Sequence, residues 1–279
     1  MGVLMVQFRC RSAKNKVADI VIATLPLKQR LKLLRQDLFA KLSYRGNKHV
    51  RIYEHPLGAR IGVGGNEIIV PSPLRWKLYR KGWPARLNQL EQEYGVGTHI
   101  QLTNNSVILD IGANAGEFAH IAARYGAHIH CIEPDAAVFA CLQDNIQELV
   151  NVTAYRELIW KEECNLEFYS APAQADSSVF EGSSEPAETM RATTVETFCH
   201  QHNISNIDLL KYDAEGAEPE VLEGIGAMFP KISVIALDTG RERHGERTNE
   251  ACTAILKKNG FQVTDETVGK RLMTFGVRA

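Results

Sequence analysis

The sequence predicts an α/β fold built on one mostly parallel sheet with helices on both faces. From residue 101 onward, apolar runs of strand length alternate with longer runs of helical periodicity, which is typical of parallel strands joined by helices. Residues 107–133 show the unit clearly, with a strand, a glycine turn, a helix and a second strand in VILDIGANAGEFAHIAARYGAHIHCIE. The last two apolar runs, FQVTDE and LMTFGVR, predict a closing antiparallel pair.

Residues 1–100 precede this alternation and are expected to form an extension, a substrate or partner region with elements of its own. The run 17–43 predicts a helix, because Pro26 suits a first turn and leucines recur on one face, namely Leu27, Leu31, Leu34, Leu38 and Leu42. Residues 50–70 predict short strands around glycines. Residues 73–94 predict a helix rich in aromatic and basic side chains.

The leucine face of residues 17–43 allows two interpretations. Internal packing or dimerisation is the commoner use of such a stripe, and a homo-oligomer would follow from it. Peripheral membrane contact is the alternative, because basic residues cover the rest of the helix, namely Lys28, Arg30, Lys32 and Arg35.

Charge divides the chain at the boundary of the extension. Residues 1–100 contain 18 Lys and Arg against 6 Asp and Glu, a balance of +12, whereas residues 101–279 contain 14 against 27, a balance of −13. The basic part either packs against the acidic domain or binds an anionic partner, such as a phosphate-bearing substrate or a membrane surface.

Composition predicts a globular protein located in the cytoplasm, and membrane association is compatible with this location. The 279 residues are 44% hydrophobic, which suffices for a full core. No apolar stretch approaches the roughly 20 residues of a spanning helix, and the first residues do not read as a signal peptide. The six cysteines are scattered, which predicts reduced thiols. The Cys/His cluster at 199–202 has no second ligand pair at zinc spacing, so no metal site is predicted.

After residue 133 the alternation continues to the closing pair. A helix is expected over 136–149 and a strand over 152–158. The stretch 162–197 combines a strand-like LEFY with polar loops, and we expect an active-site flap there. The following elements are the strand NIDLLKYDAE, the helix EPEVLEGIGAMF, the strand KISVIALDT and the helix RTNEACTAILKKNG.

The turn DIGANAG has the features of a cofactor site without phosphate. A dinucleotide loop reads GxGxxG and a phosphate loop ends in Lys and Ser or Thr; neither motif occurs here. Asp110 and Glu117 instead place acids on either side of the turn, where they oppose a phosphate and suit a cation. Glu133 follows Gly112 by 21 residues, the position from which an acid binds a ribose diol. S-adenosylmethionine, with its sulfonium and ammonium, fits this turn.

A second group of acids lies in IDLLKYDAEGAE, residues 207–218. Ligands of open parallel sheets bind beyond the carboxyl ends of the strands. The acids expected to meet there are Asp110, Glu133, Asp213 and Asp238. Asp213 and Glu215 could orient an acceptor hydroxyl and take its proton, or they could bind a divalent cation together with Asp238.

The motifs DIGANAGEF and CIEPD, followed by DLLKYDAEGAEPEVLEG, closely resemble the FkbM family of S-adenosylmethionine-dependent methyltransferases. The resemblance implies a class I methyltransferase sheet of seven strands, the last antiparallel, and O-methylation of a sugar or a related metabolite. It also implies that Glu133 holds the ribose and that the methionine end of the cofactor is lined by Asp110, Gly112, Asn114 and Gly116.

The catalytic residues are less well defined by the resemblance. An alcohol is a weak nucleophile, so a base or a metal is needed near the transferred methyl group. We predict Asp213 with Glu215 as its partner, both matches to the family's acid cluster, and His244 as a further candidate. The family's usual Glu-x-His is replaced by LDTGRERHGE, which leaves the roles of Asp238 and His244 open. A divalent metal is compatible with these acids but is not predicted.

The acceptor is expected to be a small molecule or a glycan. Trp76, Tyr79 and Arg80 are the candidate acceptor-binding residues, because aromatic faces beside cations suit a sugar or a phosphate. A helix that simply covers the main domain is the alternative for this segment.

Two other functions compete with this one. The basic extension is compatible with an RNA 2′-O-methyltransferase, but the chain has no NPPY-like run, no evident Lys-Asp-Lys-Glu tetrad and no RNA-module aromatics, so no nucleic acid partner is expected. A non-catalytic, membrane-associated scaffold that retains the fold is the other alternative. The intact motif acids count against it.

Overall fold

The computed structural model describes residues 50–171, 177–180, 187–213, 215–241, 243 and 245–278. The predicted helix at 17–43 and its leucine face lie outside these residues, as does His244. Most of the basic excess of the extension lies outside them too, because residues 1–49 contain 11 Lys and Arg against 2 Asp and Glu.

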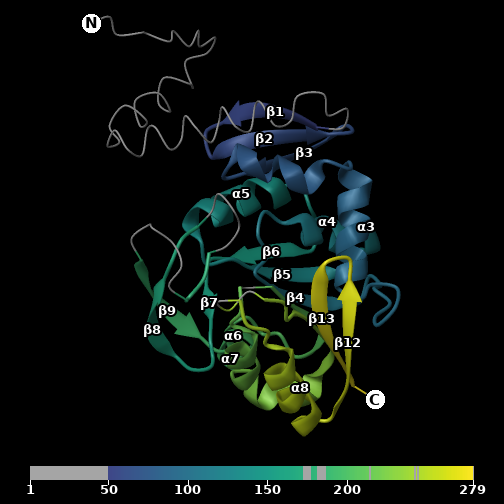
Figure 1. Ribbon diagram of the computed structural model, residues 1–279, viewed down its shortest axis with the longest axis vertical. Helices are drawn as coiled ribbons and strands as arrows, with labels where there is room; N and C mark the ends of the chain where they lie inside the picture. Colours follow the sequence, from purple (N-terminus) through teal and green to yellow (C-terminus); the bar gives the residue numbers. More distant parts are fainter. Residues whose placement is uncertain are drawn as a thin grey trace, which may run out of the picture.

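The predicted main sheet is confirmed and has seven strands in the order β12-β13-β11-β10-β4-β5-β6 (Figure 1). Its strands are β4 (Val107–Ile111), β5 (His128–Ile132), β6 (Val152–Tyr155), β10 (Ile207–Tyr212), β11 (Ile232–Asp238), β12 (Phe261–Val268) and β13 (Arg271–Arg278). The five strands from β11 to β6 are parallel to one another, whereas β13 runs antiparallel to both β11 and β12. The strand order reverses between β4 and β10, and open α/β sheets bind their ligands at the carboxyl ends of the strands at such a point.

Helices cover both faces of this sheet, as predicted (Figure 1). The helices of this domain are α4 (Glu117–Tyr125), α5 (Ala136–Ile146), α6 (Val195–Gln201), α7 (Glu218–Glu223), α8 (Asn249–Lys258) and the short 3-10 helix η2 (Gly226–Lys231). Adjacent residues of β4 point to opposite faces: Ile108 packs in the cluster that contains α4 and α5, and Leu109 packs in the cluster that contains α6, α7 and α8. Both residues are fully buried, as expected for a central parallel strand.

Residues 50–93 form three strands and two short helices. These are β1 (Val50–His55), β2 (Gly58–Val63), β3 (Asn66–Val70), η1 (Pro73–Tyr79) and α3 (Trp83–Glu93). The helix expected over 73–94 is therefore two helices, separated at Gly82, whose φ of 97° is not helical. One hydrophobic cluster runs from Val50 through these elements to Phe275 in the main sheet, so this region and the sheet share a core.

Asn145 on α5 attaches β3 to the glycine turn. Its side chain accepts a hydrogen bond from Ile69 N and donates to Ile69 O and to Ala115 O, all at 2.7–2.8 Å. The side-chain amide of Asn145 therefore pairs with the backbone of β3 as a neighbouring strand would. Its NH₂ group also donates to the glycine turn at Ala115 O. The N-terminal sheet is thus held directly against the turn predicted to bind the cofactor.

The expected helix EPEVLEGIGAMF is also divided. α7 ends at Glu223, and η2 begins at Gly226. Gly224 lies so close to Trp160 that a Cβ added there would be 2.3 Å from its carbonyl oxygen. This close approach explains why glycine interrupts the helical pattern at this position.

A second three-stranded sheet is inserted between β6 and α6. It consists of β7 (Leu158–Ile159), β8 (Cys164–Phe168) and β9 (Glu188–Thr193). Its strands β8 and β9 lie within the stretch 162–197 predicted as a flap, and β7 precedes that stretch. Ser177 and Ser178 belong to this insertion and reach the main domain at two points. The Ser177 hydroxyl donates to Asp135 after β5, at 2.8 Å, and the Ser178 hydroxyl donates to Glu215 O after β10, at 3.3 Å.

Across the described ranges, no helix combines the length and apolarity needed to cross a membrane. Five cysteines in the same ranges are free, and the reduced state of the thiols stays a prediction.

Candidate active site

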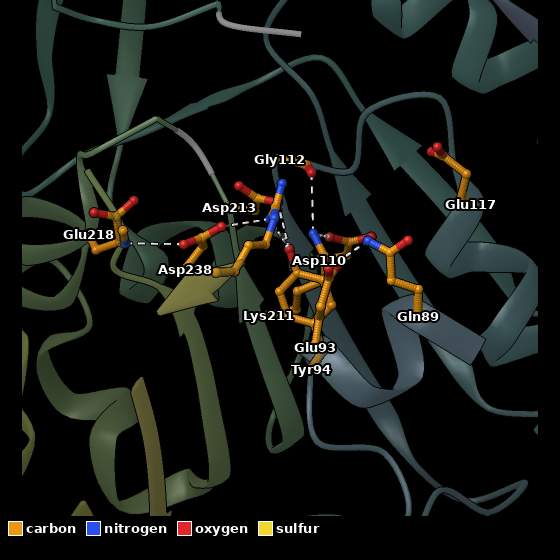
Figure 2. Close-up of polar contacts among 12 residues, drawn as sticks. Gln89, Glu93, Tyr94, Asp110, Gly112, Glu117, Lys211, Asp213, Glu218 and Asp238 are labelled. Carbon is orange, nitrogen blue, oxygen red and sulfur yellow. Dashed lines mark hydrogen bonds and ion pairs between the residues drawn. The ribbon is translucent and has the colours of Figure 1, made fainter. Parts of the chain in front are cut away.

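The acids predicted to converge do lie at one edge of the main sheet. Asp110 is in the penultimate position of β4, Asp213 follows β10 and Asp238 ends β11 (Figure 2). Glu133 follows β5 directly. The amide of Asp213 donates to Ile111 O at 3.1 Å, so the end of β10 lies against the start of the glycine turn.

Asp110 forms a buried ion pair with Lys211 of β10. The Lys211 ammonium lies 2.6 Å from Asp110 Oδ1 and 3.3 Å from Gly112 O, and the two side chains are 5% and 0% exposed. Burial raises the pKa of Asp110, and Lys211 opposes this rise. The second oxygen, Oδ2, is buried without a hydrogen-bond partner among the residues described, so it remains an available acceptor beside the turn.

The glycine turn is held by backbone contacts with β5. Gly112 N and Ala113 N both donate to Ile132 O at 3.0 Å, and Asn114 N donates to Glu133 Oε2 at 3.0 Å. Gly116 has a φ of 91°, and a Cβ added there would lie 2.8 Å from Leu142 of α5. Packing between the turn and α5 therefore requires this glycine, whatever it contributes to the cofactor site.

Glu133 binds the turn and the start of α5 at once. Besides Asn114 N, its carboxylate accepts from Asp135 N at 3.0 Å, and the side chain is buried. Burial raises its pKa to about 7, although both amide hydrogen bonds oppose the rise. This carboxyl group therefore changes charge near neutral pH.

Glu117 does not join the acids at the carboxyl edge of the sheet. Its carboxylate accepts a hydrogen bond from the Tyr79 hydroxyl at 2.8 Å and lies 3.5 Å from the Arg86 guanidinium of α3. Burial would raise the pKa of Glu117, but Arg86 and Tyr79 hold it below its usual value. The expectation that Glu117 adds to an acidic field at the turn is therefore corrected, because Arg86 compensates its charge.

Asp213 lies in a network with Tyr94, Asp238 and Arg271, which we call the Arg271 cluster. The Tyr94 hydroxyl donates to Asp213 Oδ2 at 2.5 Å, and Arg271 Nη1 lies 2.6 Å from the same oxygen and 2.7 Å from Asp238 Oδ2. Burial would raise the pKa of Asp213, but Arg271, Lys211 and the Tyr94 hydroxyl hold it well below its usual range. An acid this firmly ionised is a poor proton acceptor at neutral pH.

Glu215 and Glu218 differ in their surroundings. Glu215 is half-buried in the loop after β10, and its φ of 55° is a left-handed conformation uncommon for such a residue. Glu218 is fully buried and accepts hydrogen bonds from Gly216 N and the Thr248 hydroxyl. Burial raises the pKa of Glu218 to about 7. Glu218 therefore holds the loop that carries Glu215.

The three candidate acceptor-binding residues do not form one surface. Trp76 and Tyr79 are buried in the shared core, and only Arg80 is exposed. Tyr79 donates its hydroxyl to Glu117 and leaves no ring face for a sugar. For Trp76 and Tyr79 the structure favours the alternative, a segment that covers the main domain.

Several site residues were not identified from the sequence. Tyr94 and Arg271 come from distant segments, and nothing local marks them as partners of Asp213. Arg75 of η1 is buried and its guanidinium donates to the Asn114 side chain in the glycine turn. Lys211 could have been identified from the sequence, because a charged residue within the apolar strand IDLLKY must have a buried partner.

Comparison with known proteins gives one family. A model of the methyltransferase FkbM domain matches residues 110–263. No curated protein matches the chain. Among solved structures, precorrin-6y C5,15-methyltransferase from Geobacter metallireducens GS-15 is 12% identical, with a TM-score of 0.41 over 71% of this chain and 89% of the other. Magnesium protoporphyrin IX methyltransferase from Synechocystis PCC 6803, with bound S-adenosylmethionine, is 14% identical, with a TM-score of 0.40 over 73% and 83%.

Proposed function

The chain belongs to the FkbM family of S-adenosylmethionine-dependent methyltransferases, and from this premise we propose that it methylates a hydroxyl group of a sugar, a glycan or a related metabolite. The observation that carries the proposal is the position of Asp213, an ionised carboxylate whose backbone touches the start of the cofactor turn. A carboxylate there can accept a hydrogen bond from a sugar hydroxyl and hold it beside the methyl donor.

The described residues fit the cofactor. S-adenosylmethionine supplies a methyl group on a sulfonium, and its methionine end carries both an ammonium and a carboxylate. Asp110 has a buried oxygen without a hydrogen-bond partner in the described part of the chain, which suits the ammonium. Arg75 places a buried cation against Asn114 in the same turn, which suits the carboxylate. Glu133 would hold the ribose hydroxyls.

In this proposal the two acids after β10 have different roles. Asp213 orients the acceptor hydroxyl, because its low pKa keeps it ionised but makes it a weak base. Glu215 takes the proton, and its strained backbone conformation is of the kind found at functional sites. His244 remains a candidate outside the described residues. Membrane contact through residues 17–43 and oligomer formation also stay predictions.

The function is tested with methyl-labelled cofactor and a panel of nucleotide sugars, free saccharides and RNA. We expect label in a saccharide fraction, and we expect it to survive alkaline hydrolysis, because a methyl ether is stable to alkali whereas a methyl ester is not. Label confined to RNA or to protein, or label released by alkali, would contradict the proposal.

The Glu215→Gln variant should retain cofactor binding and lose most of its turnover.

Cofactor affinity should increase with pH across the titration of Glu133. Its pKa is about 7, and the ionised carboxylate is the stronger acceptor for ribose hydroxyls, so the Kd should fall up to about tenfold from about pH 6 to about pH 8. Calorimetry over this range measures the effect. In Glu133→Gln the affinity should be weaker and independent of pH.

A matched control is available in Glu218, the other buried glutamate with a pKa of about 7. In the part of the chain that the structure describes, Glu218 accepts hydrogen bonds from Gly216 N and the Thr248 hydroxyl and makes none to the cofactor turn. The Glu218→Gln variant should therefore keep the pH dependence of cofactor binding. If Glu133→Gln kept that dependence as well, the assignment of Glu133 would be wrong.

A further inference from the structure

The guanidinium of Arg271 lies among three oxygen atoms at the carboxyl edge of the sheet. Its Nη1 atom is 2.6 Å from Asp213 Oδ2, 2.7 Å from Asp238 Oδ2 and 3.2 Å from the Tyr94 hydroxyl. Asp213 follows β10 and Asp238 ends the neighbouring parallel strand β11, and the two carboxylates point toward the same space (Figure 2). A single nitrogen atom of β13 thus bridges the ends of two other strands.

We infer that Arg271 occupies the position at which a divalent cation would otherwise bridge Asp213 and Asp238. Hard cations prefer carboxylate oxygens as ligands. Arg271 Nη1 contacts one oxygen of each carboxylate, at 2.6 Å from Asp213 Oδ2 and 2.7 Å from Asp238 Oδ2, so one positive group bridges both acids. The guanidinium therefore provides, from within the chain, the bridging positive charge that a metal ion supplies elsewhere.

Burial explains why this position needs a cation. The Asp238 side chain is 1% exposed and that of Asp213 is 18% exposed. Two carboxylates this close to each other cannot both stay ionised away from water unless a positive charge lies between them. The Lys211 ammonium forms its ion pair with Asp110 instead, at 2.6 Å.

The inference has one consequence for metal binding and one for the reaction. Without Arg271, the paired carboxylates should gain affinity for a divalent cation, and the ion can reach them because the Arg271 side chain is 36% exposed. The second consequence rests on the proposed function: methyl transfer by the wild-type protein should not require a metal, since Asp213 is already held by the guanidinium.

The test is a Mn²⁺ titration followed by electron paramagnetic resonance, in the absence of cofactor and acceptor. We expect Arg271→Gln to bind Mn²⁺ with a Kd at least tenfold lower than that of the wild type. Lys270→Gln is the matched control, because it removes the same charge from the adjacent, exposed residue. The double variant Arg271→Gln/Asp238→Asn should lose the gain.

Two results would overturn the inference: wild-type protein that binds Mn²⁺ as tightly as Arg271→Gln, or a folded Arg271→Gln variant with no gain. If this variant is unfolded alone, circular dichroism should show that Ca²⁺ restores its fold, because a ligand that binds the folded state stabilises it; failure of Ca²⁺ to do so also counts against the inference.

Activity assays separate this inference from the proposed function. Wild-type turnover that is abolished by a chelator and restored by Mg²⁺ would refute the role of Arg271 while leaving hydroxyl methylation intact. Methyl transfer to another kind of acceptor would refute the proposed function and leave the Mn²⁺ result unaffected.

Discussion

Replacing Lys211 with methionine should lower the free energy of unfolding by about 3–5 kcal/mol, the usual cost of removing one partner of a buried ion pair. The Asp110 carboxylate is 0% exposed and would lose the ammonium that now lies 2.6 Å away. Urea denaturation measures the loss. Cofactor binding should fail together with stability, because Lys211 also donates to Gly112 O at the start of the turn.

Two further variants show whether the loss comes from the unpaired charge. Asp110→Asn/Lys211→Met removes both charges and should recover part of the stability lost in Lys211→Met. Arg191→Met removes a cation from an exposed pair, whose side chains are 78% and 42% exposed, and should cost no more than about 1 kcal/mol. Equal losses in Arg191→Met and Lys211→Met would mean that burial is not the cause.

The sign of the pH effect follows from the same pair. The pKa of Asp110 is already raised by burial, and removal of Lys211 would raise it further. A carboxyl group whose pKa is higher in the folded than in the unfolded protein stabilises the folded state at pH values below its unfolded-state pKa. This stabilisation is lost as the pH rises through its folded-state pKa. The deficit of Lys211→Met should therefore be largest at neutral pH and should shrink as the pH is lowered.

Gly116→Ala should be the second most damaging change and should act on the cofactor turn. The new Cβ would lie 2.8 Å from Leu142 and 3.2 Å from Ile146, so α5 or the turn must move. Overpacking of this kind costs about 1–3 kcal/mol, and a left-handed alanine adds about 1–2 kcal/mol. Displacement of the turn should also weaken cofactor binding, measured by calorimetry.

Gly65 is a close control for Gly116. Both residues have a φ of 91°, but a Cβ at Gly65 would meet nothing within 4 Å. Gly65→Ala should therefore show only the backbone part of the cost and leave cofactor affinity unchanged. If the two variants lost the same stability, the contact with α5 would not matter.

The sheet could be predicted because its information is local. Short apolar runs with turns between them define β4, β5, β10 and β11, and the rule that ligands bind at carboxyl ends placed their acids at one edge. Helix ends were predicted less well. The breaks at Gly82 and Gly224 depend on a backbone angle and on contact with Trp160, neither of which a helical pattern contains.

The charge state of the site could not be predicted in the same way. Arg271 is 58 residues from Asp213 along the chain, and Tyr94 is 119 residues from it. A search for acids near the turn finds the carboxylates but not the cations that compensate them. The aromatic residues of η1 were ambiguous for a related reason. From the sequence alone, Tyr79 could equally bind a sugar with its ring or pack in the core, and only its hydrogen bond to Glu117 decides between the two.

The order in which the Arg271 cluster is synthesised has a consequence for biogenesis. Tyr94, Asp213 and Asp238 all precede Arg271 in the chain, and β13, which Arg271 begins, inserts between β11 and β12. A nascent chain that has not reached β13 lacks the guanidinium that bridges the two acids, and its sheet has an open edge at β11. Such a chain is a candidate for chaperone binding on the ribosome, and the site becomes complete only when the last strand is added.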